Sequence, residues 1–410
     1  MQYSATSWSL SRRSFVAASA LAASTAATCG LSACGQNAND AEDAREGGEV
    51  GEPLDQKVGR LLSSLSREQK VAQLFVVHPE ALTGVGTQTS AGDATREALG
   101  AHPVGGLILS ASNLVDPAQT EELVARLKSL GREAAAGLAP LVAVDEEGGT
   151  VSRVASNPAF DIANVGNMSD VGQTGDPARA RDAAATIAAY LGGYGFGVDF
   201  APVCDVVSDP ANSSMALRSF GSDPDVVSAM ASAQIEAFCE GGICCCAKHF
   251  PGIGNAQGDS HEQMISLGKD LDELKALELR PFAAAIESDV PMVMVGHLSC
   301  PAVVGDKTPA SLSSVMVQGL LRSQMGYEGV VITDSLDMGA VATWVRKDCQ
   351  GVAALAAGCD LILTPVDFDE AYRGVLDALD SGELSQERLD ESVRRIIALK
   401  LRFSLVSEDA

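Results

Sequence analysis

Eight short apolar runs, spaced along the chain from about residue 70 onward, constrain its fold more than any other feature. Each run is hydrophobic without a break, which indicates a strand buried on both faces, as in a parallel sheet. Stretches with helical periodicity separate these runs, so the pattern alternates strand and helix. The expected strands are residues 73–77, 106–109, 141–144, 198–202, 243–247, 292–295, 330–333 and 360–363.

The helical stretches complete the repeating unit. A strong amphipathic pattern at 385–403 begins with a capping residue, Ser385, and carries Leu389, Val393 and Ile396 on one stripe. Eight β-α repeats predict an α/β fold, a (β/α)8 TIM-type barrel forming a single catalytic domain over residues 55–410. A doubly wound sheet is the alternative, but eight units fit closure better. The other expected helices are 120–135, 178–191, 224–240, 271–287, 312–324 and 351–357.

The net charge restricts the partners of this chain. It has 29 Lys+Arg against 54 Asp+Glu, a formal net charge of −25. Such an acidic protein lacks the cations that neutralise a phosphate backbone, so we expect no nucleic-acid partner. Electrostatic docking on anionic lipid is excluded for the same reason.

The first 34 residues read as an export signal. Arg12-Arg13 precedes a short apolar, Ala-rich stretch, which is typical of the twin-arginine route, and Leu31-Ser32-Ala33-Cys34 resembles the lipobox of bacterial lipoproteins. We therefore expect a lipid on Cys34 that holds the protein on the outer face of the cytoplasmic membrane, its only membrane contact. An ordinary signal peptide with an incidental cysteine is the alternative. Residues 35–54 are acidic and nearly free of large apolar residues, which predicts a disordered linker.

The chain has ten cysteines, with an unusual run at Cys244-Cys245-Cys246. This run falls in an expected buried strand, where three thiols act as small apolar side chains. No C-x-x-C pair occurs, so a structural zinc site has little support. The sequence leaves the pairing of the other cysteines open.

Polar residues follow the strand ends, which is where a barrel of this type gathers its chemistry. These residues are Asp145, Asp205, Lys248, His249, His297 and Asp334. Asp334 ends an apolar strand, where a charge is costly to bury and rigidly held, as suits the nucleophile of a glycosidase. On local sequence alone, an aspartate that caps the next helix is an equally good interpretation.

The loop 252–261, GIGNAQGDSH, is rich in glycine and ends with Asp259 and His261. Glycines permit motion, so His261 can swing toward a site, and Asp259 can raise the pKa of its imidazole. This dyad suits a general acid and base near neutral pH. The alternatives are a helix cap by Asp259 or Ser260, and a metal site with His249, whose spacing matches no pair of ligands on one helix.

Together these motifs resemble glycoside hydrolase family 3, in its β-N-acetylglucosaminidase branch. The motif K-H-F-P-G at 248–252, combined with Asp259-Ser260-His261, is specific to that branch, and the resemblance runs from residue 65 to the last helix. It implies that Asp334 is the nucleophile, His261 the general acid/base and Asp259 its partner. By the same resemblance, the residues that contact the sugar are Asp145, Arg218, Lys248, His249 and His297.

Two departures from the family pattern concern the aglycone side. Thr150 replaces the usual arginine after E-G-G, and residues 208–217 lack the N-P-x-x-G pattern before R-S-F-G.

The resemblance implies an exo-acting, retaining enzyme that removes terminal β-linked N-acetylglucosamine (GlcNAc). Because the protein is expected to be exported, the implied substrate is a peptidoglycan fragment. The enzyme needs no cofactor and no metal, and we expect a monomer. The rival hypotheses are a β-N-acetylglucosaminide phosphorylase, a β-glucosidase and a non-catalytic sugar-binding lipoprotein.

Overall fold

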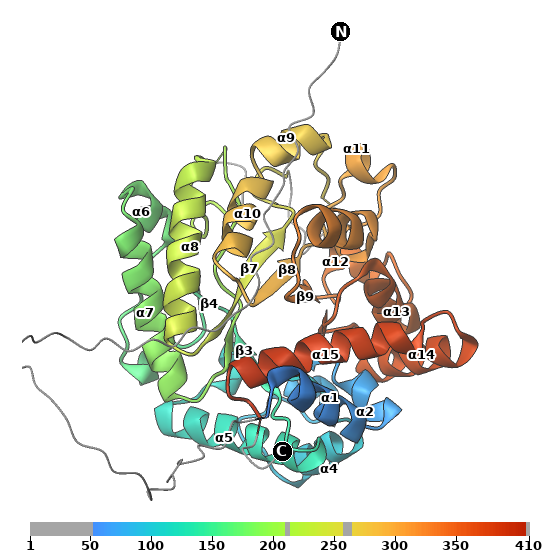
Figure 1. The fold of residues 1–410 in the computed structure, drawn as a ribbon. Coiled ribbons are helices and arrows are strands. Elements are labelled where there is room, and N and C mark those ends of the chain that lie inside the picture. Colours follow the sequence, from blue (N-terminus) through green and yellow to red (C-terminus); the bar gives the residue numbers. More distant parts are fainter. Residues whose placement is uncertain (1–51, 210–213, 257–264, 407–410) are drawn as a thin grey trace, which may run out of the picture. The chain divides into compact units, whose positions relative to one another are not determined.

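The computed structural model describes residues 52–209, 214–256 and 265–406. Eight parallel strands form one sheet in the order β10-β1-β2-β3-β6-β7-β8-β9. Figure 1 labels β3, β7, β8 and β9 of this sheet. Hydrogen bonds between β9 and the residues just before β10, including the bridge Ile332–Leu361, close this sheet into a barrel. The strands are β1 (Phe75–Val77), β2 (Gly106–Ile108), β3 (Leu141–Val144), β6 (Val198–Asp199), β7 (Cys244–Phe250), β8 (Met292–Val295), β9 (Val330–Thr333) and β10 (Ile362–Leu363).

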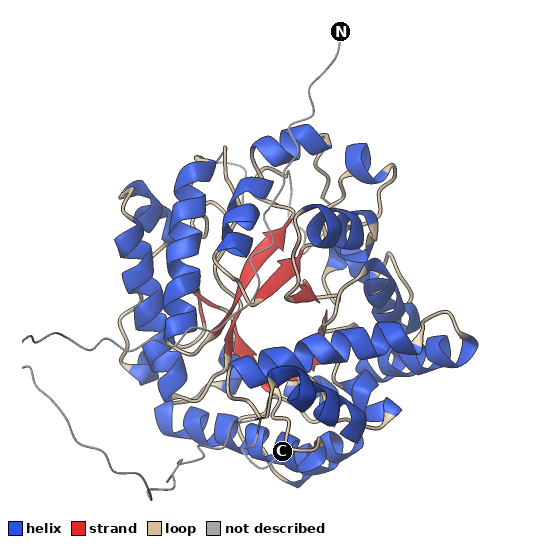
Figure 2. Ribbon diagram, in the orientation of Figure 1, coloured by secondary structure: helices blue, strands red, loops and turns tan. Residues whose placement is uncertain are grey.

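Helices surround these strands as an outer layer (Figure 2). The predicted (β/α)8 barrel is therefore confirmed, and every expected strand is present, three of them with the expected bounds. The helices are α1 (Leu54–Ser64), α2 (Arg67–Ala72), α3 (Pro79–Thr83), α4 (Asp93–Ala101), α5 (Pro117–Ala134), α6 (Met168–Gln173), α7 (Pro177–Gly193), α8 (Pro224–Glu240), α9 (Leu271–Ala276), α10 (Leu279–Glu287), α11 (Pro301–Val304), η5 (Val315–Gln324), α12 (Gly339–Ala342), α13 (Lys347–Ala357), α14 (Phe368–Ser381) and α15 (Gln386–Arg402).

The single helix expected at 271–287 is wrong, because the structure has two helices there, α9 and α10. Pro281 explains the break: its ring lacks an N–H and clashes with the carbonyl four residues earlier, at Leu277. Leu277 accordingly leaves the helical region, with φ −132° and ψ −76°. The helix expected at 312–324 is also different, because it begins at Val315 and has π-helical, i to i+5 hydrogen bonds, such as Gly319 N to Ser314 O.

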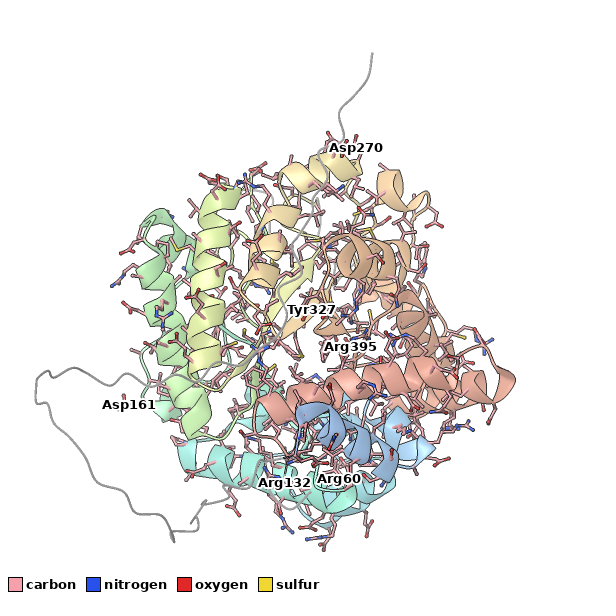
Figure 3. All side chains as sticks on the ribbon, in the orientation of Figure 1. Arg60, Arg132, Asp161, Asp270, Tyr327 and Arg395 are labelled. Atoms are coloured by element: carbon pink, nitrogen blue, oxygen red, sulfur yellow. The ribbon has the colours of Figure 1, made fainter. Side chains whose placement is uncertain are left out.

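Helix α15 packs across the amino ends of the strands. Its predicted cap is confirmed, since the Ser385 side chain accepts a hydrogen bond from the Arg388 amide. Leu389, Val393 and Ile396 of the expected stripe are buried in the core. Arg395, labelled in Figure 3, reaches Asp360 just before β10, with 3.1 Å between Nη1 and Oδ1. The other end of the barrel, at the carboxyl ends of the strands, remains free to form a site.

Candidate active site

A cavity of about 440 Å³ lies at the carboxyl ends of the barrel strands. Its walls come from β2, β7, β8 and β10 themselves and from the residues that follow β1, β2, β3, β6, β7, β9 and β10, so the closed barrel brings distant parts of the chain together. The lining residues are His78, Ile108, Leu109, Ser110, Asp145, Glu147, Val151, Arg153, Met215, Arg218, Lys248, His249, Ile253, Met294, Asp334, Ser335, Asp337, Met338, Leu363 and Thr364.

A network of two cations and two carboxylates forms one wall. Lys248 Nζ lies 2.8 Å from Asp145 Oδ1 and 2.6 Å from Glu147 Oε1. Arg218 grips the same Glu147 through two parallel hydrogen bonds, Nε to Oε2 at 2.7 Å and Nη2 to Oε1 at 2.6 Å. Such bidentate, charge-assisted bonds fix both partners in orientation. Only Asp145 among the four is substantially exposed to the cavity, at 25% of its side chain.

The buried charges of Glu147 and Lys248 persist at neutral pH. Burial works against ionisation of Glu147, but Lys248 and Arg218 outweigh it and lower the pKa of its carboxyl to about 2. Burial likewise opposes the charge on Lys248, yet Asp145 and Glu147 raise the pKa of its ammonium above the usual value. The wall therefore presents fixed donors and acceptors of the kind that bind sugar hydroxyls.

His249 is held by Asp205, a carboxylate with no exposed surface. The ring Nδ1 lies 2.8 Å from Asp205 Oδ2, and the other oxygen, Oδ1, accepts the Ile253 amide at 2.7 Å. Since a carboxylate accepts, Nδ1 carries the proton and Nε2 is left for the cavity. The peptide bond that joins Lys248 to His249 is cis.

Asp334 stands directly after β9, and its amide continues the ladder by donating to the Val295 carbonyl of β8 at 2.8 Å. Its side chain accepts the Ser335 amide at 2.8 Å and lines the cavity. Burial tends to raise the pKa of Asp334, but His249, His297 and the Ser335 amide outweigh it and hold that pKa below its usual value. The carboxylate is thus ionised and rigid. It does not cap the next helix, because α12 begins at Gly339 with Met338 as its cap residue.

His297 is buried and is not one of the residues that line the cavity. Its Nε2 donates to the Ser335 carbonyl at 2.8 Å, and its Nδ1 pairs with the Ser311 hydroxyl at 2.8 Å. Burial lowers the pKa of this imidazole, so the ring is neutral and both nitrogens are occupied. In this arrangement His297 supports the segment that carries Asp334.

The structure thus brings five of the sequence-predicted site residues, Asp145, Arg218, Lys248, His249 and Asp334, to one cavity. Asp259 and His261 lie outside the described residues, as does Cys34, so their roles stay predictions. Within the described ranges, no group of three or more His, Cys, Asp or Glu has an arrangement that could hold a metal ion.

Sequence reasoning missed two carboxylates of this site. Glu147 was given no role, yet it anchors Arg218 and Lys248. Asp205 was expected only as a polar residue after a strand end, yet it anchors His249. A signal for Glu147 existed, because it sits two residues after Asp145 on the same short segment. No sequence signal pairs Asp205 with His249, since they are 44 positions apart.

A short hairpin after β3, which the sequence analysis treated as loop, shapes the same wall. Strands β4 (Glu146–Gly148) and β5 (Val151–Ser152) pair antiparallel. The buried Glu146 carboxylate holds them by accepting the amides of Arg153, Val154 and Ala155 and the Tyr190 hydroxyl. Arg153 therefore lines the cavity from a fixed backbone position.

Comparison with known proteins agrees with this geometry. The family model described as "Glycosyl hydrolase family 3 N terminal domain" matches residues 66–399. The chain is 33% identical over 330 residues to a β-hexosaminidase A of Pseudoalteromonas piscicida, covering 75% of this chain and 54% of that one. It is also 33% identical over 323 residues to a β-hexosaminidase of Idiomarina loihiensis, covering 78% and 92%.

A solved structure gives the same result. The family 3 β-N-acetylglucosaminidase from Paenibacillus sp. str. FPU-7 superposes with a TM-score of 0.78 at 35% identity, covering 85% of this chain and 64% of that one. The chain belongs to glycosyl hydrolase family 3, a family of barrel glycoside hydrolases. The branch expected from sequence, that of the β-N-acetylglucosaminidases, is confirmed by these relatives. The chain spans about half of the Pseudoalteromonas protein and nearly all of the Idiomarina one.

None of the helices in the described ranges is both long and apolar enough to cross a membrane.

Proposed function

We propose that this chain is an exo-acting β-N-acetylglucosaminidase that removes terminal β-linked GlcNAc with retention of configuration. The observation that carries this proposal is the ionised, rigidly held carboxylate of Asp334 in a cavity walled by the Lys248–Asp145–Glu147–Arg218 network. A retaining glycosidase needs such a carboxylate beneath the anomeric carbon and fixed polar groups that orient the sugar.

The reaction then takes two displacement steps. Asp334 attacks the anomeric carbon, its oxygen bonds to that carbon, and the bond to the leaving oxygen breaks. His261 protonates the leaving oxygen and next takes a proton from water, which hydrolyses the glycosyl-enzyme and frees Asp334. Asp259 stabilises the imidazolium. The roles of His261 and Asp259 rest on the sequence motif.

The substrate we propose is a peptidoglycan fragment with GlcNAc at its non-reducing end. Arg153 supports an anionic aglycone: its guanidinium is on the cavity wall and makes no hydrogen bond or ion pair with any residue of the chain that the structure describes. By contrast, the cations Lys248 and Arg218 are each bound to carboxylates. An unpaired guanidinium suits a carboxylate such as the lactyl group of muramic acid.

The site of action we propose is the outer face of the bacterial cytoplasmic membrane. The supporting features are the twin-arginine pattern and the lipobox-like Leu31-Ser32-Ala33-Cys34, followed by the acidic stretch 35–54. A lipid on Cys34 would tether the barrel near its substrate, the cell wall.

The test compares release of 4-nitrophenol from the β-N-acetylglucosaminide and from the β-glucoside, with and without inorganic phosphate. We expect turnover of the first only, free β-GlcNAc as the initial product seen by NMR, and no sugar phosphate. Sugar 1-phosphate in the phosphate arm would instead make the protein a phosphorylase. A folded protein that binds GlcNAc but turns over neither substrate would contradict catalysis and leave a sugar-binding protein.

A further inference from the structure

Asp199 carries a fully buried carboxyl group at the carboxyl end of β6, and the reaction above gives it no role. Its side chain has no exposed surface. Strand β6 lies between β3 and β7 in the barrel and pairs in parallel with both, with Asp199 opposite Val144 and Cys245. Asp145 follows β3 and Lys248 belongs to β7. Asp199 therefore occupies the strand between these two members of the charged network in the cavity wall.

One oxygen of Asp199 holds the backbone that carries two members of that network. Asp199 Oδ1 accepts the amide of Glu146 at 2.9 Å. Glu146 is the middle residue of Asp145-Glu146-Glu147, whose two outer side chains line the cavity. The buried carboxylate of Glu146 accepts three amides of the hairpin and the Tyr190 hydroxyl instead. The Asp199 hydrogen bond thus ties the centre of this segment to β6.

The other oxygen of Asp199, Oδ2, is buried and has no hydrogen-bond partner among the described residues. Within the same residues no cation forms an ion pair with Asp199, since the nearby Lys248 pairs with Asp145 and Glu147. An isolated charge is too costly to bury, so a carboxyl in such a place takes up a proton. Oδ2 then carries the proton, and Oδ1 stays the acceptor of the Glu146 amide.

The electrostatic surroundings of Asp199 act in the same sense. Burial, the largest effect, raises the pKa of Asp199 well above its usual value. The Glu146 and Asp145 charges add to this rise, whereas the Glu146 amide and Lys248 oppose it. A charged Asp199 would also attract the Lys248 ammonium away from Asp145. A neutral acid offers the Glu146 amide an acceptor and leaves that ion pair undisturbed.

We propose that Asp199 is a positioning residue of the candidate active site, whose uncharged carboxyl accepts the Glu146 amide and so fixes the direction in which Asp145 and Glu147 enter the cavity. Displacement of this segment would move both carboxylates relative to Lys248, and small displacements of groups that orient a substrate are costly to catalysis. Asp199 acts only through these neighbours, because it is not one of the residues that line the cavity. The inference rests on the proposed function, which assigns this wall to GlcNAc binding.

The test compares Asp199→Asn, Asp199→Leu and Asp199→Ala with wild type in the full chain. Asparagine keeps an oxygen that accepts the Glu146 amide and cannot ionise, leucine has a similar shape without an acceptor, and alanine takes the place of leucine if that variant does not fold. Active sites are counted as the fraction of chains that a fluorinated N-acetylglucosaminyl fluoride labels covalently. The value of kcat/KM on an aryl β-N-acetylglucosaminide is then divided by that fraction, so that poorer folding alone leaves it unchanged.

We expect Asp199→Asn to keep kcat/KM per site within about two-fold of wild type, because its oxygen still accepts the amide. The leucine or alanine variant should lower it by about 10-fold. The control is Gln73→Leu, which removes a buried hydrogen bond to the Pro103 carbonyl, of 2.6 Å, at the amino end of β1. It should reduce stability and leave kcat/KM per site unchanged. An unchanged value in the leucine or alanine variant would overturn the proposal, and so would an equal loss in Asp199→Asn.

The affinity for GlcNAc, measured by isothermal titration calorimetry, separates this inference from the proposed function. We expect the leucine or alanine variant to bind GlcNAc about 10-fold more weakly than wild type and Asp199→Asn to bind it equally well. A wild-type chain that binds GlcNAc without acquiring the covalent label would contradict the proposed function, and the affinities would then decide the role of Asp199 alone. Equal affinities in wild type and in the leucine or alanine variant would contradict that role.

Discussion

Glu147 is the residue on which the sugar-facing wall depends, although no atom of it needs to touch the sugar. It binds Lys248 and accepts hydrogen bonds from Nε and Nη2 of Arg218, and its pKa of about 2 keeps it charged. Removing a buried partner leaves the opposite charges uncompensated, which costs far more than breaking a surface pair. Glu147 therefore holds Lys248 and Arg218 in position.

This dependence predicts the effect of Glu147→Gln. We expect kcat/KM on an aryl β-N-acetylglucosaminide to fall by about 100-fold, because small displacements of positioning groups are that costly. We also expect a loss of about 2–4 kcal/mol in the free energy of unfolding. Glu133→Gln, which breaks an exposed pair with Arg96, is the matched control and should change neither. Urea denaturation and steady-state kinetics on both variants provide the check.

Arg153 makes a separate prediction about the aglycone. Arg153→Gln should lower kcat/KM for GlcNAc linked to muramic acid by about 10-fold, the worth of one charge-assisted hydrogen bond. Cleavage of the same disaccharide with its carboxylate amidated should not change. The control is Arg179→Gln, an exposed arginine at the start of α7. Equal losses on the two substrates would show that Arg153 does not recognise the anion.

At the scale of elements, the strands were predictable because burial on both faces removes polar residues from them. Predicting the connections was harder. The break between α9 and α10 follows from Pro281, a signal that the amphipathic pattern around it concealed. Helix α14 was not predicted at all, although Asp367 caps it and Phe368, Ala371 and Val375 form a buried stripe.

The candidate site, like the fold, was predictable only in part. Residues expected directly after strand ends, such as Asp334 and Lys248, were found because barrel topology brings those ends together, although the structure extends β7 to include Lys248. The partners of these residues were not, because Asp205 and His249 meet through the spacing of adjacent strands, which no local pattern encodes. The orientation of His297 was also not predictable. Its position after a strand was evident from the sequence, but its two hydrogen bonds, which decide whether the ring faces the cavity, were not.

Packing of α15 against α2 buries a lysine side chain whose charge state affects the stability of the fold. Lys400 has no exposed surface, and its Nζ has one hydrogen bond, to Gln73 Oε1 at 2.7 Å. Burial lowers the pKa of this ammonium to about 7, against 10.5 for an unperturbed lysine. Between these values the unfolded chain binds a proton that the folded chain does not. Stability should therefore rise with pH from about 7 to 10.5 through this group.

Lys400→Met tests this account of the element. We expect the variant to be more stable than wild type by about 1–3 kcal/mol at pH 7, since an apolar side chain avoids the cost of a buried ammonium. The difference should shrink as the pH rises toward 10, because the folded wild type then holds Lys400 as the neutral amine and no longer buries an ammonium. Chemical denaturation at several pH values measures it. A variant less stable than wild type at pH 7 would show that the Gln73 hydrogen bond outweighs the buried charge.

For the whole molecule, the barrel separates two sets of groups. The carboxyl ends of the strands carry the cavity, its fixed charges and Asp334, whereas the amino ends carry buried Lys400 and the Asp360 ion pairs. Stability can therefore be altered at the amino ends of the strands without a change in the cavity. Variants at the amino end serve as controls for those in the cavity.

The most direct test of the central claim is covalent trapping of the glycosyl-enzyme. The chain is incubated with a fluorinated N-acetylglucosaminyl fluoride, whose adduct forms quickly and hydrolyses slowly, and is then measured by intact mass and by peptide fragmentation. We predict one sugar adduct per chain, on Asp334, absent in Asp334→Ala and retained in Asp337→Asn, whose carboxylate lines the same cavity. An adduct on any other residue, or turnover without an adduct and with inverted product, would contradict the mechanism.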